Sequence, residues 1–142
     1  MDGIIIVDKP KGITSFKVIE FIRRLTRVRR VGHAGTLDPW ATGVLIVCVG
    51  KTCGLVSKLV ACDKEYLARI TFGISTDTGD PQGKIIGKEP VNIKKEDLEK
   101  ALKSFVGESM QIPPMVSAVR HKGKHLYDLA RKGITVEREP RK

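Results

Sequence analysis

The pattern of apolar and polar positions predicts the order strand, helix, loop, strand, helix, strand, strand, helix, strand, helix. Strands are expected where β-branched or alternating apolar residues run between turn-forming residues, and helices where apolar residues recur every three or four positions. The predicted strands are residues 3–8, 44–49, 65–72, 84–87 and 115–119, and the predicted helices are 15–25, 55–61, 94–105 and 126–131. With no internal repeat, this order indicates an α+β fold with a mixed, mainly antiparallel sheet and packed helices.

Three of these elements have a distinctive pattern. Thr14 or Ser15 can cap the first helix, whose apolar stripe is expected to include Phe16, Ile19, Ile22, Val18 and Leu25. Residues 44–49 are continuously apolar, which is typical of a strand buried on both faces. The helix at 94–105 has a clear stripe and ends before Gly107, where a cap belongs; the stripe is Leu98, Ala101, Leu102 and Phe105.

Residues 31–42 show no periodicity and are rich in small, polar and turn-forming residues, so they are predicted to form a loop. Within this loop Asp38 precedes Pro39, whose ring keeps the preceding residue out of the helical conformation. A carboxylate on such a rigid backbone suits a nucleophile or an acid/base group, and an Asp-Pro turn with a capping role is the plainer interpretation.

Composition and charge limit the range of possible functions. The 142 residues include 26 Lys and Arg against 16 Asp and Glu, a net charge of +10, with 41% hydrophobic residues. This length and apolar content fit one domain with a real core and exclude general disorder. The excess of positive charge predicts a polyanionic partner such as nucleic acid, the alternative being a soluble protein that happens to be basic. Five arginines lie within residues 23–30. They are interpreted either as a solvated helix face or as phosphate ligands.

No apolar run reaches the length of a membrane span, and the start lacks a secretory signal, so a cytoplasmic location without membrane contact is expected. Cys48, Cys53 and Cys62 fit no common zinc or redox spacing and are expected to be buried free thiols. His121 and His125 are four apart, but Gly123 between them and the lack of a third ligand favour a basic loop over a metal site.

A nucleotide-binding loop is also rejected. The tripeptide beginning at Gly50 lies between a predicted strand and a predicted helix, as in a phosphate-binding loop. That motif needs a glycine five positions before Gly50, where this chain has Leu45 inside a strand. These spacings therefore indicate neither a nucleotide-binding loop nor a metal site.

The string Gly32-His33-Ala34-Gly35-Thr36-Leu37-Asp38-Pro39-Trp40-Ala41-Thr42-Gly43 closely resembles the active-site signature of the TruB family of tRNA pseudouridine synthases, whose catalytic residue is the aspartate. The resemblance covers almost the whole chain. Further matching segments are 8–15, 63–66, 76–80, 113–118 and 124–127.

This resemblance implies a pseudouridine-synthase-like catalytic domain and a cofactor-free isomerisation of a T-loop uridine, position 55 of tRNA. Asp38 would act on the ribose or on the uracil. Because a base in folded RNA must be flipped out before reaction, Tyr66 would stack on it and His33 would help to fill the vacated space. The full-length family implies a monomer that binds the T stem-loop.

The basic segment from about 108 to 135 corresponds to an insertion that folds over the T loop like a thumb in this family. By resemblance, the cationic side chains of this thumb-like segment would contact RNA phosphates; they are Arg120, Lys122, Lys124, Arg131 and Lys132. Val116 replaces a common aromatic residue and Arg120 replaces the usual lysine.

The chain is about half the length of family members, so it is interpreted as the N-terminal part of the catalytic domain. The expected missing parts are the rest of the sheet, an arginine that pairs with the aspartate, and the C-terminal RNA-binding domain. Two alternatives remain: a catalytically incomplete RNA-binding fragment, and a guide-RNA-dependent relative. Ala41-Thr42 favours the stand-alone bacterial type.

Overall fold

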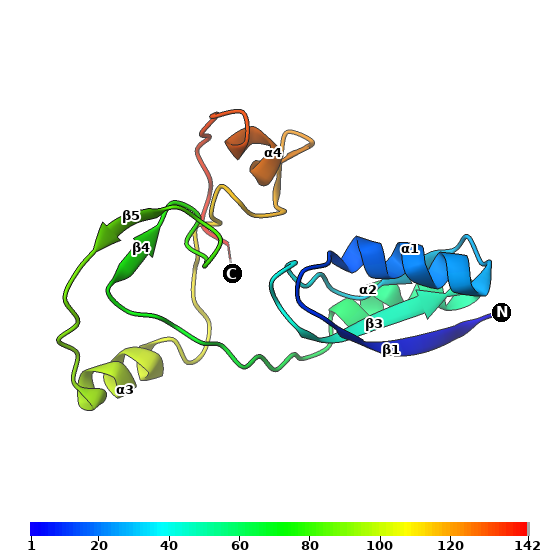
Figure 1. Cartoon of the computed structure of the whole chain (residues 1–142), viewed down its shortest axis with the longest axis horizontal. Coiled ribbons are helices and arrows are strands. Elements are labelled where there is room, and N and C mark those ends of the chain that lie inside the picture. The colour runs from blue at the N-terminus through cyan, green and yellow to red at the C-terminus, as the bar shows by residue number, and fades with distance from the viewer. Residues whose placement is uncertain (142) are drawn as a thin grey trace. The chain divides into compact units, whose positions relative to one another are not determined.

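The structure is a computed structural model that describes residues 1–141. Its internal contacts divide the chain into two compact units, Met1–Leu67 and Ala68–Lys142. Both combine helices with antiparallel strands, so the predicted α+β class is confirmed (Figure 1). No helix formed by the described residues has both the length and the apolar character needed to cross a bilayer.

The first unit is built on a three-stranded sheet in the order β1-β3-β2. Its strands are β1 (Gly3–Lys9), β2 (Val31–His33) and β3 (Gly43–Val49), and both pairings are antiparallel. β1 and β3 pair along their whole length, from Gly3 opposite Val49 to Lys9 opposite Gly43. The predicted strands at 3–8 and 44–49 are therefore confirmed as β1 and β3.

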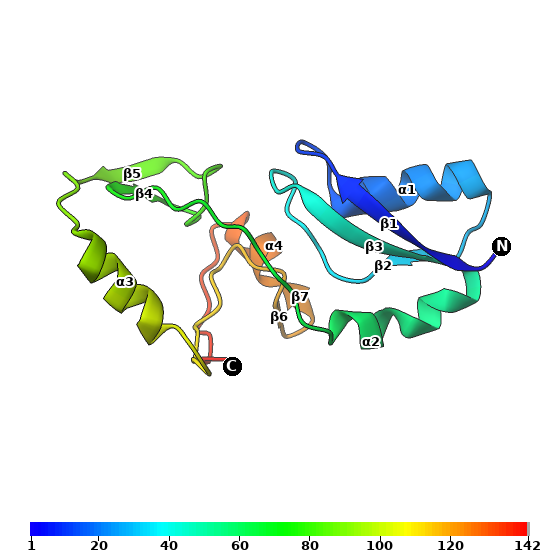
Figure 2. The same cartoon turned by 90° about the horizontal axis from the view of Figure 1, so that it is seen from below.

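Helix α1 (Ser15–Thr26) begins as predicted, because the side chain of Thr14 accepts a hydrogen bond from Lys17 N. It lies across one face of the sheet (Figure 2). Its buried side chains share one stripe; they are Ser15, Val18, Ile19 and Ile22. Phe16 and Leu25 were wrongly placed in this stripe and are 56% and 69% exposed. At 100° per residue they point well away from its centre.

The core of this unit lies between α1 and the face of the sheet that α1 covers. It is formed by Val18, Ile19, Ile22, Val31, Leu45, Val47 and Val49. Side chains alternate between the two faces of a strand, so Ile6 and Val44 point to the other face and are 62% and 67% exposed. The prediction that residues 44–49 are buried on both faces is therefore wrong at Val44, because α1 covers only one face.

After β3 the chain forms a short 3₁₀ helix, Gly50–Leu55, and then α2 (Val56–Val60), close to the predicted helix at 55–61. All three cysteines are free, as expected. Only Cys48 is buried, whereas Cys53 is half-buried and Cys62 exposed. The expectation of three buried thiols was wrong for the latter two, because the segment after β3 lies outside the core.

The described residues of the second unit form two hairpins and two helices. A hairpin joins β4 (Ile74–Thr76) to β5 (Ile85–Lys88), and a second joins β6 (Arg120–His121) to β7 (Lys124–His125). The helices are α3 (Lys95–Ser104) and α4 (Leu126–Ala130), both as predicted. α4 buries Leu126 and Leu129, while the apolar stripe of α3 is mostly exposed.

Two strand predictions and one loop prediction need correction. Residues 65–72 pair with no described strand and are exposed, so the alternating pattern there forms no strand; β4 begins only at Ile74. Residues 115–119 form turns rather than a strand. The predicted loop at 31–42 begins with β2, which is too short for a periodic pattern and is held by pairing with β3.

Candidate active site

The loop that carries Asp38 connects β2 to β3. Asp38 is exposed and opens a turn in which Ala41 N donates to Asp38 O at 3.1 Å. No described residue forms a hydrogen bond or ion pair with the Asp38 carboxylate. The carboxylate is therefore free to meet a substrate from solvent.

The residue before Asp38 is fixed in three ways. Ser15 Oγ donates to Leu37 O at 3.0 Å and accepts from Leu37 N at 3.0 Å. The side chain of Leu37 packs against the core. Because Ser15 is 2% exposed, these hydrogen bonds are shielded from water, which makes their loss costly. The backbone on the N-terminal side of Asp38 is thus held by the first turn of α1.

The residue after Asp38 is fixed by the turn that follows β1. Pro39 O accepts from Gly12 N at 2.7 Å and from Lys9 Nζ at 3.4 Å. Lys9 Nζ also donates to Pro10 O at 3.0 Å and Ile13 O at 2.9 Å. Lys9 is fully buried, so its ammonium must be satisfied by these carbonyls. Asp38 therefore projects from a loop that is held on both sides by residues 9–15.

His33 ends β2 on the same loop and is half-buried. Its Nδ1 lies 2.6 Å from Gly35 O, and because a carbonyl can only accept, this contact requires a proton on Nδ1. In the tautomer with the proton on Nδ1, Nε2 is the acceptor nitrogen. The ring is thus oriented by its own loop.

Gly35 and Gly43 flank the loop and have φ angles of 106° and 122°, which side chains rarely adopt. A Cβ added at either glycine would meet no atom within 4 Å. These glycines therefore allow the sharp turns of the loop and leave open space around it.

Tyr66 is not brought to this loop by any contact in the described structure. It is 70% exposed, and it lies in a segment without secondary structure. Asp38 and His33 are therefore the predicted site residues that share the fixed loop.

Three of the basic residues of the thumb-like segment, Arg120, Lys122 and Lys124, lie on the β6–β7 hairpin. Lys122 and Gly123 form its turn, with φ angles of 48° and 83°. Arg120 pairs with His125 and His121 pairs with Lys124, and paired residues point to the same face. Arg120 and Lys124 therefore point to opposite faces, and so do His121 and His125.

Arg131 has a different environment. Its guanidinium lies 5.4 Å from the centre of the Tyr127 ring, which stacks on His125 with centroids 5.0 Å apart and a 10° angle between the planes. His125 Nδ1 is 2.8 Å from Ala118 O, which fixes that ring. Arg131 is thus ordered by an aromatic contact.

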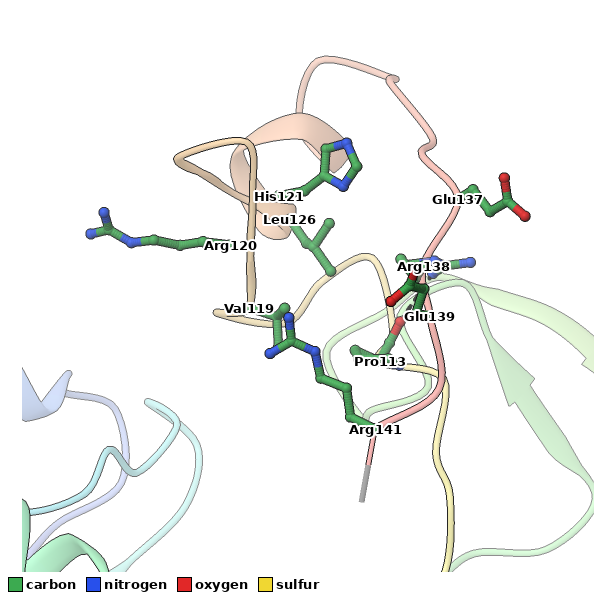
Figure 3. Close-up of a pocket in the computed structure, with 9 residues that line it drawn as sticks. All are labelled: Pro113, Val119, Arg120, His121, Leu126, Glu137, Arg138, Glu139 and Arg141. Carbon is green, nitrogen blue, oxygen red and sulfur yellow. Dashed lines mark hydrogen bonds between the residues drawn. The ribbon is translucent and has the colours of Figure 1, made fainter.

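The second unit also contains a pocket of about 390 Å³ (Figure 3). It is lined by Pro113, Val119, Arg120, His121, Leu126, Glu137, Arg138, Glu139 and Arg141. Arg120 extends away from Glu137 and Arg138 in Figure 3. Because acidic and basic side chains are mixed here, the pocket does not have the uniform charge of a phosphate site. No group of three potential metal ligands occurs among residues 1–141.

A family model covers most of the chain. Residues 23–142 match the model of the TruB family pseudouridylate synthases, N-terminal domain. The chain belongs to the TruB family. The match includes β2, the Asp38 loop and the thumb-like segment.

Full relatives support this membership. "tRNA pseudouridine synthase B" of Fusobacterium nucleatum is 51% identical over 141 residues, which are 99% of this chain and 49% of the relative. The protein of the same name from Clostridium tetani is 49% identical, over 100% of this chain and 50% of its own length. This chain thus spans about half the length of these TruB relatives.

A solved structure is also similar. A chain in a crystal structure of a Cbf5-Nop10-Gar1 complex matches with a TM-score of 0.54 and 27% sequence identity. The match covers 83% of this chain and 31% of that chain. The likeness supports the pseudouridine-synthase-like fold expected of a TruB family member.

Sequence reasoning missed the residues that hold the loop, namely Lys9, Gly12 and Ser15. The segment 8–15 is similar to a family motif, but that similarity alone does not show which backbone groups its residues contact. No local pattern marks Lys9 as buried, because a lysine at the end of a strand is ordinarily exposed.

Proposed function

We propose that this chain is the N-terminal part of a catalytic domain that isomerises the T-loop uridine at position 55 of tRNA to pseudouridine. The observation that carries the proposal is the exposed, unpaired carboxylate of Asp38 on a backbone held at Leu37 and at Pro39. Reactive groups need this kind of fixed placement, since small misplacements lower rates strongly.

The proposed reaction is balanced without a cofactor. The bond from ribose C1′ to uracil N1 breaks, the uracil rotates, and a bond from C1′ to C5 forms. C5 loses its proton to solvent and N1 gains one, so product and substrate are isomers. Asp38 acts as a nucleophile, attacking either ribose C1′ or the uracil ring, and both roles use an ionised, accessible carboxylate.

The target base must leave its stack before it reaches Asp38. In this proposal Tyr66 supplies the stacking surface and His33, through its oriented ring, occupies part of the vacated space. The exposed and contact-free position of Tyr66 is compatible with ordering on RNA binding. Arg120, Lys122, Lys124 and Arg131 would contact the backbone of the T arm, with Lys132 beside them.

The experiment measures release of tritium from tRNA that carries 5-³H-uridine, because only C5 loses its hydrogen in this isomerisation. No guide RNA is added. Asp38→Asn should abolish release and leave tRNA affinity nearly unchanged. Asp97→Asn, an equivalent change on exposed α3, should release tritium at the wild-type rate. Full activity of Asp38→Asn would contradict the proposal.

A second candidate is an RNA-binding chain without turnover. It is favoured by one observation, that no contact in the described structure holds Tyr66 at the Asp38 loop. In that case the wild-type chain would bind tRNA with a strong salt dependence and release no tritium.

A further inference from the structure

The arginine cluster at residues 23–30 is outside the site described above. It consists of Arg23, Arg24, Arg27, Arg29 and Arg30. All five side chains are exposed, and no ion pair joins any of them to the described acidic residues. Half of the ten arginines of the chain therefore lie within eight positions and share no acidic partner.

The cluster borders a shallow, largely open depression. A pocket of about 390 Å³ is lined by Arg23, Arg27, Val28 and Arg29, with no acidic residue. Three guanidinium-bearing side chains around one hollow concentrate positive potential there. This uniform charge differs from the mixed charge of the pocket at Arg120.

Two of the arginines are ordered before any ligand arrives. Arg23 Nη2 donates to Val31 O at 2.9 Å, and the guanidinium of Arg24 lies 5.7 Å from the centre of the Phe21 ring. Ordering in the free protein reduces the conformational entropy that binding must remove. A merely solvated helix face would not need these contacts.

The residue type also points to phosphate. The chain contains 16 lysines and ten arginines, yet every cationic residue between positions 23 and 30 is arginine. The planar guanidinium binds phosphate oxygens in pairs, whereas lysine offers a single strongly hydrated charge. Two cationic residues would be enough to complement the end of the α1 dipole, and Arg23 and Arg24 already lie in its last turn.

The cluster lies at the opposite end of the first unit from Asp38. Ser15 at the start of α1 contacts Leu37, and Arg27 follows the last residue of the helix. At 1.5 Å per residue, α1 separates these points by about 17 Å. The sheet gives the same separation. Arg30 O accepts from Gly50 N just beyond the C-terminal end of β3, whereas Gly43, at the other end of β3, pairs with Lys9.

We propose that the arginine cluster at residues 23–30 is a second phosphate-binding surface, which binds the RNA backbone several nucleotides away from the uridine at Asp38. This inference rests on the proposed function. It assigns to the cluster the task of orienting the RNA across the first unit, in addition to the contacts made by the thumb-like segment.

The test measures tRNA affinity as a function of salt for the double variant Arg27→Gln/Arg29→Gln. Each lost phosphate contact should lower the slope of log affinity against log salt by roughly 0.7–0.9, so the double variant should lose about 1.5. Its affinity at low salt should fall roughly tenfold. The control Lys100→Gln/Lys103→Gln removes the same charge from exposed positions of α3 and should leave the slope nearly unchanged.

A second double variant, Arg27→Lys/Arg29→Lys, separates charge from folding. It should keep the wild-type slope, because both charges remain. A slope for the glutamine variant equal to wild type, or a slope for the lysine variant that falls as far as that of the glutamine variant, would overturn the inference. If the wild-type chain releases tritium and the glutamine variant keeps the wild-type slope, the cluster proposal alone is rejected. If the wild-type chain neither binds tRNA nor releases tritium, the proposed function is rejected as well.

Discussion

At the scale of single residues, the site depends on side chains that hold the backbone of Asp38. Ser15 Oγ binds both polar backbone groups of Leu37 from a buried position, and Lys9 Nζ reaches three carbonyls. A buried polar group that loses its partner costs roughly 1–3 kcal/mol. These residues therefore link the stability of the first unit to the placement of the carboxylate.

Ser15→Ala should lower turnover more than it lowers RNA affinity, because Leu37 loses its hydrogen bonds and Asp38 loses its fixed position. Thr14→Ala is the matched control, since it removes the cap at Lys17 N and costs about 1 kcal/mol without touching the loop. Both variants are compared by urea denaturation and by kcat and KM. Equal kcat values in the two variants would reject a positioning role for Ser15.

Lys9→Met should destabilise the chain by roughly 1–3 kcal/mol or more, because three carbonyls lose a buried charged donor. The same change at exposed Lys11 should have little effect. The measurement is the midpoint of chemical denaturation. A Lys9→Met chain as stable as the wild type would show that the buried ammonium does not stabilise the turn.

At the scale of elements, the sequence predicted those segments whose pattern is local. The Thr14 cap and the stripe positions Val18, Ile19 and Ile22 of α1, the extent of α3, the β-branched run of β1 and the apolar run of β3 were each readable from neighbouring residues. β2 was missed because three residues that include Gly32 carry no period and are defined by pairing with β3. The alternating pattern at 65–72 led to a wrong strand prediction, because a strand also needs a partner strand to pair with.

Some features of the candidate site were also predictable from the sequence and others were not. Asp38 and His33 were identified because their string resembles a family signature and lies on a predicted loop. The hydrogen bonds from Lys9, Gly12 and Ser15 join residues more than twenty positions apart, and no local pattern reports such contacts. The opposite orientation of Arg120 and Lys124 likewise follows only from the β6–β7 register.

The β6–β7 hairpin offers a test of its own. Lys122 adopts a φ of 48°, which asparagine tolerates better than lysine. Lys122→Asn should therefore hold or raise the melting temperature while weakening tRNA binding through the lost charge. Lys124→Asn loses the same charge without relief of the turn and should not gain stability. Unchanged tRNA affinity and salt slope in both variants would remove this hairpin from the RNA-binding surface.

At the scale of the whole molecule, the cysteines report on folding of the first unit. Burial, with a contribution from nearby Cys53, raises the pKa of the Cys48 thiol above its ordinary value of 9.0. The folded state then holds this proton more tightly than the unfolded chain, so stability should decrease as pH rises past about 9. Cys48→Ala should reduce that decrease, and an identical pH profile for this variant would contradict the assignment.

The central claim concerns the reaction, and pseudouridine mapping tests it most directly. The chain is incubated with unmodified tRNA, and pseudouridines are located by carbodiimide treatment and primer extension. The account predicts a single new stop at the T-loop uridine with the wild-type chain and none with Asp38→Asn. Stops elsewhere, or the same stop with Asp38→Asn, would contradict it.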